Sequence, residues 1–139
     1  MFIQSLAFKY ANNPETIYIF QEKLDPWGFE VFGVHLFNQT GIFSQYVVGT
    51  AELAASVLLL IGLIKKNLTI RFLGALMGLG IISGAIIFHL FTPLGVAVVD
   101  ADGTSDGGQL FAMACSVWLA TAILLFLSKD HILGLLSKR

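Results

Sequence analysis

The sequence predicts an all-α protein, a bundle of helices that crosses a membrane several times. Of its 139 residues, 56% are hydrophobic and only 12% are charged, and the mean hydropathy is +0.81. This composition lies outside the usual range of soluble domains. Three stretches nearly free of charge are each long enough to cross the roughly 30 Å hydrocarbon core of a bilayer as a helix. We therefore expect a single membrane domain over residues 1–139.

The chain starts with a short apolar segment, residues 1–8, followed by Lys9 and Tyr10, a pair typical of a membrane interface. So short a segment cannot cross a bilayer, and it lacks the cleavage site of a signal peptide. It represents either the last turns of a first span or a short surface anchor. Because the following segment is expected to lie outside the cell, our hypothesis is that residues 1–8 close a first span whose beginning is absent from this chain.

Residues 9–45 are predicted to be exoplasmic or interfacial. An Asn-Pro-Glu sequence at 13–15 indicates a helix start, because Asn caps, Pro fits the first helical position and Glu is favoured in the first turn. This amphipathic helix should run to about Leu24 and end at turn residues 25–28. The aromatic, mildly polar stretch 29–45 is predicted to lie on the membrane surface as a helix or loop.

Transmembrane helices are predicted over residues 46–64, 72–93 and 109–128, followed by a cytoplasmic tail at 129–139. The middle span carries glycines at four-residue spacing, which let a neighbouring helix approach closely in lipid. These expected helix-packing positions are Gly74, Gly78, Gly80 and Gly84.

Charges on the connecting segments predict the orientation. The loop between the first two complete spans and the C-terminal tail are basic, with Lys65, Lys66, Arg71, Lys129, Lys138 and Arg139. The loop between the last two spans is acidic, with Asp100, Asp102 and Asp106. The positive-inside rule therefore places the C-terminus in the cytoplasm and the acidic loop outside.

Composition also limits the chemistry. A net charge of −1 gives no electrostatic argument for nucleic acid as a partner. The lone Cys115 excludes an intrachain disulfide or dithiol pair. No residue is assigned to catalysis, and no metal site is expected from one histidine and one glutamate.

Two ionisable residues lie within the predicted spans, Glu52 and His89, and such residues are candidate functional sites because desolvating them is costly. Glu52 falls about 9 Å, and His89 about 6 Å, below the outer interface. Lys9 and Gln109 fall in the same outer-leaflet layer. We therefore predict one shared pocket lined by these four side chains.

Three roles for this pocket remain open. In a purely structural role, Glu52 and His89 satisfy each other and link two helices, with Lys9 as counter-ion. In a redox or proton-linked role, histidine donates a hydrogen bond to a quinone carbonyl and the carboxylate exchanges the proton, which makes a quinone the candidate cofactor. The third role is a path for an ion or small solute, which is disfavoured because no internal repeat or second buried acid is visible.

Several motifs together resemble those of bacterial DoxX-like membrane proteins. They are Phe8-Lys9-Tyr10, Pro14-Glu15, Pro26-Trp27-Gly28, Gly49-Thr50-Ala51-Glu52-Leu53, Gly84-Ala85-Ile86-Ile87-Phe88-His89-Leu90 and Asp106-Gly107-Gly108-Gln109-Leu110-Phe111. The resemblance implies a four-helix bundle in a bacterial inner membrane, and kinship with the small subunit of archaeal thiosulfate:quinone oxidoreductase and with MauE-type proteins. This chain departs from the family in its nearly missing first span and in a longer segment between Gly28 and Gly49, which could dock a partner.

Two functions follow as hypotheses. The first is an accessory subunit of a membrane redox or respiratory assembly, with the shared pocket facing a quinone. The alternative is a non-catalytic scaffold or assembly factor that binds other membrane proteins through its glycine faces and the 29–45 segment. Either function has the lipid bilayer as partner, together with another membrane protein or a second copy of this chain.

Overall fold

The chain folds into helices and irregular loops. A computed structural model describes residues 2–137, and within them the only β pairing is an isolated bridge between Val99 and Ser105. The helices are α1 (Phe2–Tyr10), α2 (Pro14–Ile17), the π-helix η1 (Tyr18–Leu24), α3 (Asp25–Phe32), α4 (Gln45–Ile64), α5 (Leu68–Phe91) and α6 (Gln109–Leu136). The predicted all-α class is confirmed. Of these helices, α4, α5 and α6 are long and apolar enough to cross a membrane, so this is a multi-pass membrane protein.

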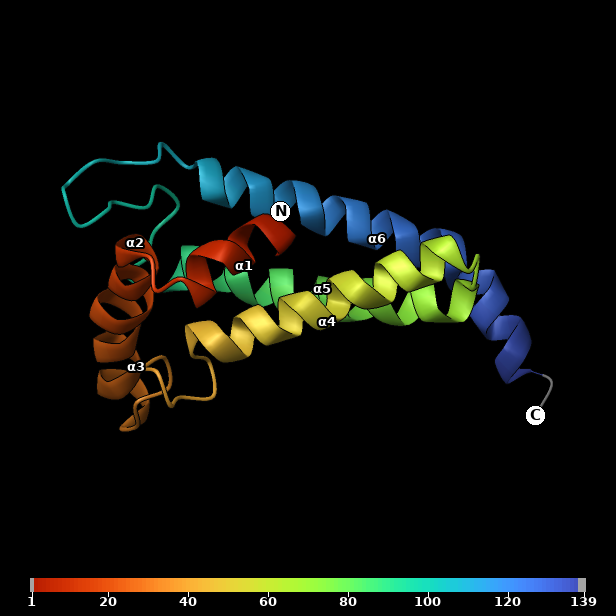
Figure 1. Ribbon diagram of the computed structural model, residues 1–139, viewed down its shortest axis with the longest axis horizontal. Coiled ribbons are helices and arrows are strands. Elements are labelled where there is room, and N and C mark those ends of the chain that lie inside the picture. Colours follow the sequence, from red (N-terminus) through yellow and green to blue (C-terminus); the bar gives the residue numbers. More distant parts are fainter. Residues whose placement is uncertain (1, 138–139) are drawn as a thin grey trace.

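The three long helices run along the longest axis of the molecule, while α2, η1 and α3 stand across one end (Figure 1). Helix α5 packs against both α4 and α6, and the short α1 packs along α4. Gly49 permits this last contact, because a Cβ there would lie 3.4 Å from the Lys9 and Tyr10 side chains. Helix α1 therefore lies alongside the first long helix and not across the end of the bundle (Figure 1).

The ends of the long helices follow local capping. Helix α5 starts earlier than predicted, because the side chain of Asn67 accepts a hydrogen bond from the backbone N–H of Ile70 at 3.0 Å. It ends at Phe91, since the next residue precedes Pro93 and adopts an extended conformation. Helix α6 continues to Leu136, beyond the predicted end at residue 128. Two cations of the predicted cytoplasmic tail, Lys138 and Arg139, lie outside the described residues.

The predicted stop at residues 25–28 is wrong. The start is as expected, with the Asn13 side chain accepting from the backbone N–H of Glu15 at 2.9 Å. The helix then widens into η1, where the N–H of Asp25 donates to the carbonyl of Phe20, five residues back, and passes directly into α3. Proline is tolerated in the first turn of α3 because its missing N–H is not needed there. The actual end is Gly33, at a left-handed φ of 72°.

Close packing between α4 and α5 depends on two glycines. A Cβ on Gly62 would lie 2.6 Å from the backbone nitrogen of Arg71, and one on Gly74 would lie 2.8 Å from that of Leu59. Gly78 is also buried. At Gly80 and Gly84, however, a Cβ would meet nothing within 4 Å, so the expectation of tight packing at these two positions is wrong within this chain.

The end of the bundle near α2 and α3 is closed by η1 and by the loops before α4 and after α5. Their shared core consists of Leu24, Phe37, Leu94 and Val98. The carboxylate of Asp106 holds the second loop, since its Oδ1 accepts from the N–H groups of Val98 at 2.7 Å and Gly108 at 2.9 Å, and its Oδ2 accepts from that of Leu110 at 3.0 Å. These bonds also fix the start of α6.

The first loop is held by the buried carboxylate of Asp25. Its Oδ1 accepts from the backbone N–H groups of Phe37 and Asn38, both at 3.0 Å, and its Oδ2 lies 2.6 Å from Nδ1 of His35. Burial raises the pKa of Asp25, but the hydrogen bonds from His35 and the two N–H groups outweigh burial and hold the pKa below its usual range. The folded state therefore binds the proton less readily than the unfolded chain does.

We expect Asp25→Asn to lower the free energy of unfolding by about 1–2 kcal/mol at neutral pH, because hydrogen bonds to a charged group are lost. A depressed pKa gives stability that is present above the unfolded-state value, about 3.9, and lost as the pH falls through the folded-state value. The variant should consequently lose less stability on acidification than the natural protein. Thermal unfolding in detergent from about pH 6 to pH 3 measures this, with the exposed Glu30→Gln as control.

Candidate functional site

A cavity of about 520 Å³ lies beneath the loops before α4 and after α5, and residues of α1, α2, η1, α4, α5 and α6 line it. Its size is typical of small-molecule sites. The walls are mainly apolar and include Phe20, Val48, Ile81, Phe88 and Ala114. The wall residues Phe8, Val47 and Leu110 are also exposed on the surface of the molecule, so the mouth of the cavity is mainly apolar, with Glu15 as a charged residue exposed there.

A buried ion pair forms the polar side of this cavity. Nζ of Lys9 lies 2.7 Å from Oε2 of Glu52, and the two side chains are only 12% and 10% exposed. The hydroxyl of Ser5 donates to the same carboxylate oxygen at 2.7 Å. Ser5 precedes Lys9 by one helical turn, so both side chains share the face of α1 that meets α4. The lysine compensates the charge of a carboxylate that would be costly to bury alone.

Gln45, the first residue of α4, holds the end of α1 in place. Its Nε2 donates to the backbone carbonyl of Lys9 and to Oδ1 of Asn12, each at 2.9 Å. The reach of Lys9 toward Glu52 is therefore set by a junction between two helices. Sequence reasoning missed Ser5 and Asn12; the four-residue spacing of Ser5 and Lys9 was a signal for the former, whereas nothing in the sequence pointed to the latter.

His89 lies on the α5 wall of the cavity and is buried. Its Nδ1 is 2.7 Å from the carbonyl oxygen of Gly95, in the loop that follows α5. Because a carbonyl oxygen only accepts hydrogen bonds, Nδ1 carries the proton in this contact. The ring also meets Phe111 of α6 edge to face, with centroids 5.6 Å apart. The imidazole is thus oriented from two sides.

The structure brings three of the four predicted site residues to one cavity. Lys9, Glu52 and His89 all line it, but Glu52 and His89 do not hydrogen-bond to each other, so the expectation that they satisfy one another is wrong. Gln109 is exposed at the start of α6 and lies outside the lining. The face of α6 toward the cavity instead begins one residue later, at Leu110.

Glu52 and His89 each carry one polar atom with unused hydrogen-bonding capacity. Oε2 of Glu52 accepts from Lys9 and Ser5, whereas Oε1 makes no hydrogen bond within residues 2–137. Likewise, Nδ1 of His89 is occupied by Gly95, and Nε2 has no partner in the same part of the chain. Because both side chains border the cavity, these are the atoms with which it can recognise a ligand.

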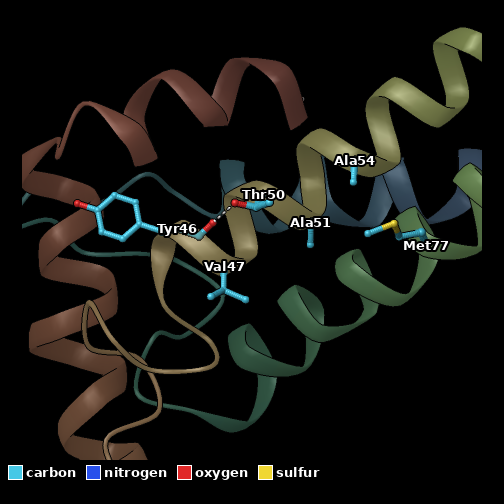
Figure 2. Close-up of a pocket in the computed structure, with 6 residues that line it drawn as sticks. All are labelled: Tyr46, Val47, Thr50, Ala51, Ala54 and Met77. Carbon is cyan, nitrogen blue, oxygen red and sulfur yellow. Dashed lines mark hydrogen bonds between the residues drawn. The ribbon is translucent and has the colours of Figure 1, made fainter.

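A second, shallower pocket of about 420 Å³ lies on α4 and α5 and has no ionisable side chain apart from the tyrosine phenol (Figure 2). The Thr50 hydroxyl donates to the backbone carbonyl of Tyr46 at 2.7 Å and lies 2.6 Å from the hydroxyl of Tyr10, and the Tyr46 hydroxyl donates to Oδ1 of Asn12. Val47 and Ala51 lie on the side of α4 that faces α5 (Figure 2). This pocket offers a ligand little beyond apolar contact.

Fold and site together define a small multi-pass membrane protein with a mainly apolar cavity near one end of its bundle, bordered by a buried ion pair and a histidine. Within the described residues, no group of three or more His, Cys, Asp or Glu side chains is placed to hold a metal ion. Comparisons with family models, curated proteins and solved structures found no match to this chain. The resemblance to DoxX-like proteins therefore stays a prediction.

Proposed function

We propose that this protein is a DoxX-like accessory subunit of a membrane redox assembly, and that the cavity binds the ring of a quinone-class lipid. The observation that carries the proposal is a cavity of about 520 Å³ with mainly apolar walls, a mainly apolar mouth and two buried ionisable side chains, Glu52 and His89. The mouth favours a ligand dissolved in lipid over one dissolved in water. Support for the redox assembly comes from the family resemblance.

The apolar and the polar residues of the lining have different roles in binding. Apolar side chains hold the ring and tail of the ligand, and the free atoms of Glu52 and His89 fix its orientation. Lys9 pairs with the carboxylate of Glu52, and this ion pair offsets the cost of burying its charge. A carboxylate and an imidazole are also groups that exchange protons readily.

We further propose that the protein lies in a bacterial inner membrane with the cavity in the outer leaflet. The α4–α5 turn carries Lys65 and Lys66, with Arg71 in the first turn of α5, and the opposite end of the bundle carries the acidic loop at 100–106. Figure 1 places these two segments at opposite ends of the long axis. The positive-inside rule then puts the C-terminus in the cytoplasm.

The alternative, a scaffold for other membrane proteins, is favoured by the exposure of α6. This helix is the least buried of the three candidate spans and packs against α5. Its outward face carries large apolar side chains such as Leu119, Ile123 and Phe126. In a scaffold role, a helix of a partner protein or of a second copy covers this face.

Binding of a short-chain ubiquinone to the purified protein in lipid nanodiscs separates the two functions. For the reduced form of this probe, we expect Glu52→Gln and His89→Ala each to weaken binding about tenfold, because each removes an acceptor that a ligand hydroxyl can contact. Glu30→Gln and His131→Ala are the matched controls, since both residues are exposed and lie outside the cavity lining. If the site variants only lower the yield of folded protein while quinone affinity stays unchanged, the scaffold is the better account.

A further inference from the structure

We infer that the cavity prefers a ligand that donates hydrogen bonds, so that it binds the hydroquinone form of such a lipid more tightly than the oxidised quinone. This inference rests on the proposed function, because it concerns the same cavity. It reverses the role first assigned to the histidine, which was to donate a hydrogen bond to a quinone carbonyl. The reason lies in the contacts that the two buried ionisable side chains already make.

The N–H group of the His89 imidazole is already used in a hydrogen bond within the protein. A neutral imidazole carries one N–H, and in His89 this group is Nδ1–H, which donates to the carbonyl of Gly95 at 2.7 Å. The other nitrogen, Nε2, then presents a lone pair to the cavity. A ligand hydroxyl can donate to this atom, whereas a ligand carbonyl placed there would face another acceptor.

The carboxylate of Glu52 is an acceptor as well. Nζ of Lys9 lies 2.7 Å from Oε2 in an ion pair, and the carboxylate of an ion pair has no proton to donate. Oε2 already receives the Ser5 hydroxyl and the Lys9 ammonium, which leaves Oε1 for a ligand. Because Oε1 only accepts hydrogen bonds, a hydroxyl of the ligand can bind it and a carbonyl of the ligand cannot.

The remaining polar groups of the lining do not reverse this preference. The ammonium of Lys9 donates to Glu52 and, at 3.3 Å, to Ser5, which leaves one of its three N–H groups as a competing donor against the two acceptor atoms. Thr16 also lines the cavity, and a hydroxyl either donates or accepts. Glu15 is a further acceptor at an exposed position. The two oriented atoms, Oε1 of Glu52 and Nε2 of His89, therefore set the preference.

A hydroquinone carries two hydroxyl groups at opposite ends of its ring, and the quinone carries two carbonyls in their place. Quinone binding leaves buried acceptors facing acceptors, and an unsatisfied buried polar group is costly. One such mismatch corresponds to a difference in affinity of about tenfold. We expect the hydroquinone to bind at least about tenfold more tightly than the quinone.

The test compares a one-isoprene ubiquinone with its hydroquinone, both binding to the full chain in nanodiscs under anaerobic conditions at about pH 8, where an imidazole is ordinarily neutral. Glu52→Gln, which replaces one acceptor oxygen by an N–H donor of the same shape, should reduce the preference, and the remote Glu30→Gln should leave it unchanged. The dimethyl ether of the hydroquinone, which cannot donate, should bind the unaltered protein as weakly as the quinone. This last comparison uses only the unaltered protein, so it does not depend on whether a variant folds.

The outcomes separate the two proposals. Equal affinity for both redox forms, tighter binding of the quinone, or ether binding as tight as that of the hydroquinone would overturn the preference while leaving the cavity as a quinone-class site. If neither form binds at concentrations up to the solubility of the probes, the proposed function fails together with the inference. A preference that Glu30→Gln abolishes as fully as Glu52→Gln does would also overturn it.

Discussion

Lys9→Met is expected to lower the free energy of unfolding by about 3–5 kcal/mol, the cost of leaving a buried carboxylate without its partner. The Lys9 and Glu52 side chains are 12% and 10% exposed, and lipid offers the orphaned charge no replacement for the ammonium. The hydroxyl of Ser5 remains as a donor to Oε2, but one neutral hydrogen bond does not compensate a full charge. Because α1 is short, the loss should also loosen its contact with α4.

The measurement is reversible unfolding in mixed micelles, or thermal unfolding in detergent. Lys65→Met is the matched control, because it removes the same charge from an exposed position at the end of α4. The double variant Lys9→Met/Glu52→Gln should recover most of the stability, since neither charge is then left alone. If Lys9→Met and Lys65→Met destabilise the protein equally, the ion pair does not hold α1 in place.

The fold class and the long helices could be predicted because the bilayer restricts the possibilities. A backbone surrounded by lipid must satisfy its own hydrogen bonds, so each long uncharged stretch had to be a helix. The polar residues between these stretches then determine where the helices end. Asn13 and Asn67 both accept backbone hydrogen bonds at helix starts, in keeping with the capping preference of asparagine.

The continuation of the helix through Pro26 could not be predicted from local chemistry. An Asp-Pro-Trp-Gly sequence is rich in turn residues, and each favours a stop. Contacts with residues distant in the sequence outweigh these local preferences. The carboxylate of Asp25 accepts a hydrogen bond from the backbone N–H of Phe37. Gly28 allows the Phe37 ring to approach, since a Cβ at Gly28 would lie 2.9 Å from Cε2 of Phe37. Tertiary contacts of this kind leave no local pattern.

That Glu52 and His89 border one cavity was predictable, but their contacts were not. Counting residues from the interface placed Glu52 and His89 in one layer, and both border the cavity. Depth does not determine which groups meet, however, and His89 bonds to a loop carbonyl only six residues further along the chain. A stripe of small residues is equally ambiguous, since Gly74 packs tightly while Gly84 borders open space.

Gly62→Ala is expected to cost about 1–3 kcal/mol or more, whereas Gly84→Ala should be neutral or slightly stabilising. A Cβ on Gly62 would lie 2.6 Å from the nitrogen and 2.8 Å from the Cα of Arg71, and backbone atoms cannot turn aside as a side chain can. The first turn of α5 must therefore move away from α4. At Gly84 the new methyl meets nothing within 4 Å, and alanine favours the helix.

The same pair of variants separates helix packing from the cavity, because the two glycines differ in what a side chain would meet. Gly84 lines the cavity, so Gly84→Leu should weaken quinone binding while the unfolding free energy stays near that of the natural protein. Gly62 lies near the other end of the bundle, so its alanine variant should lose stability without altering the affinity of the protein that remains folded. A Gly84→Leu variant that unfolds readily, with Gly62→Ala unaffected, would show that the cavity is filled by close helix packing and holds no ligand.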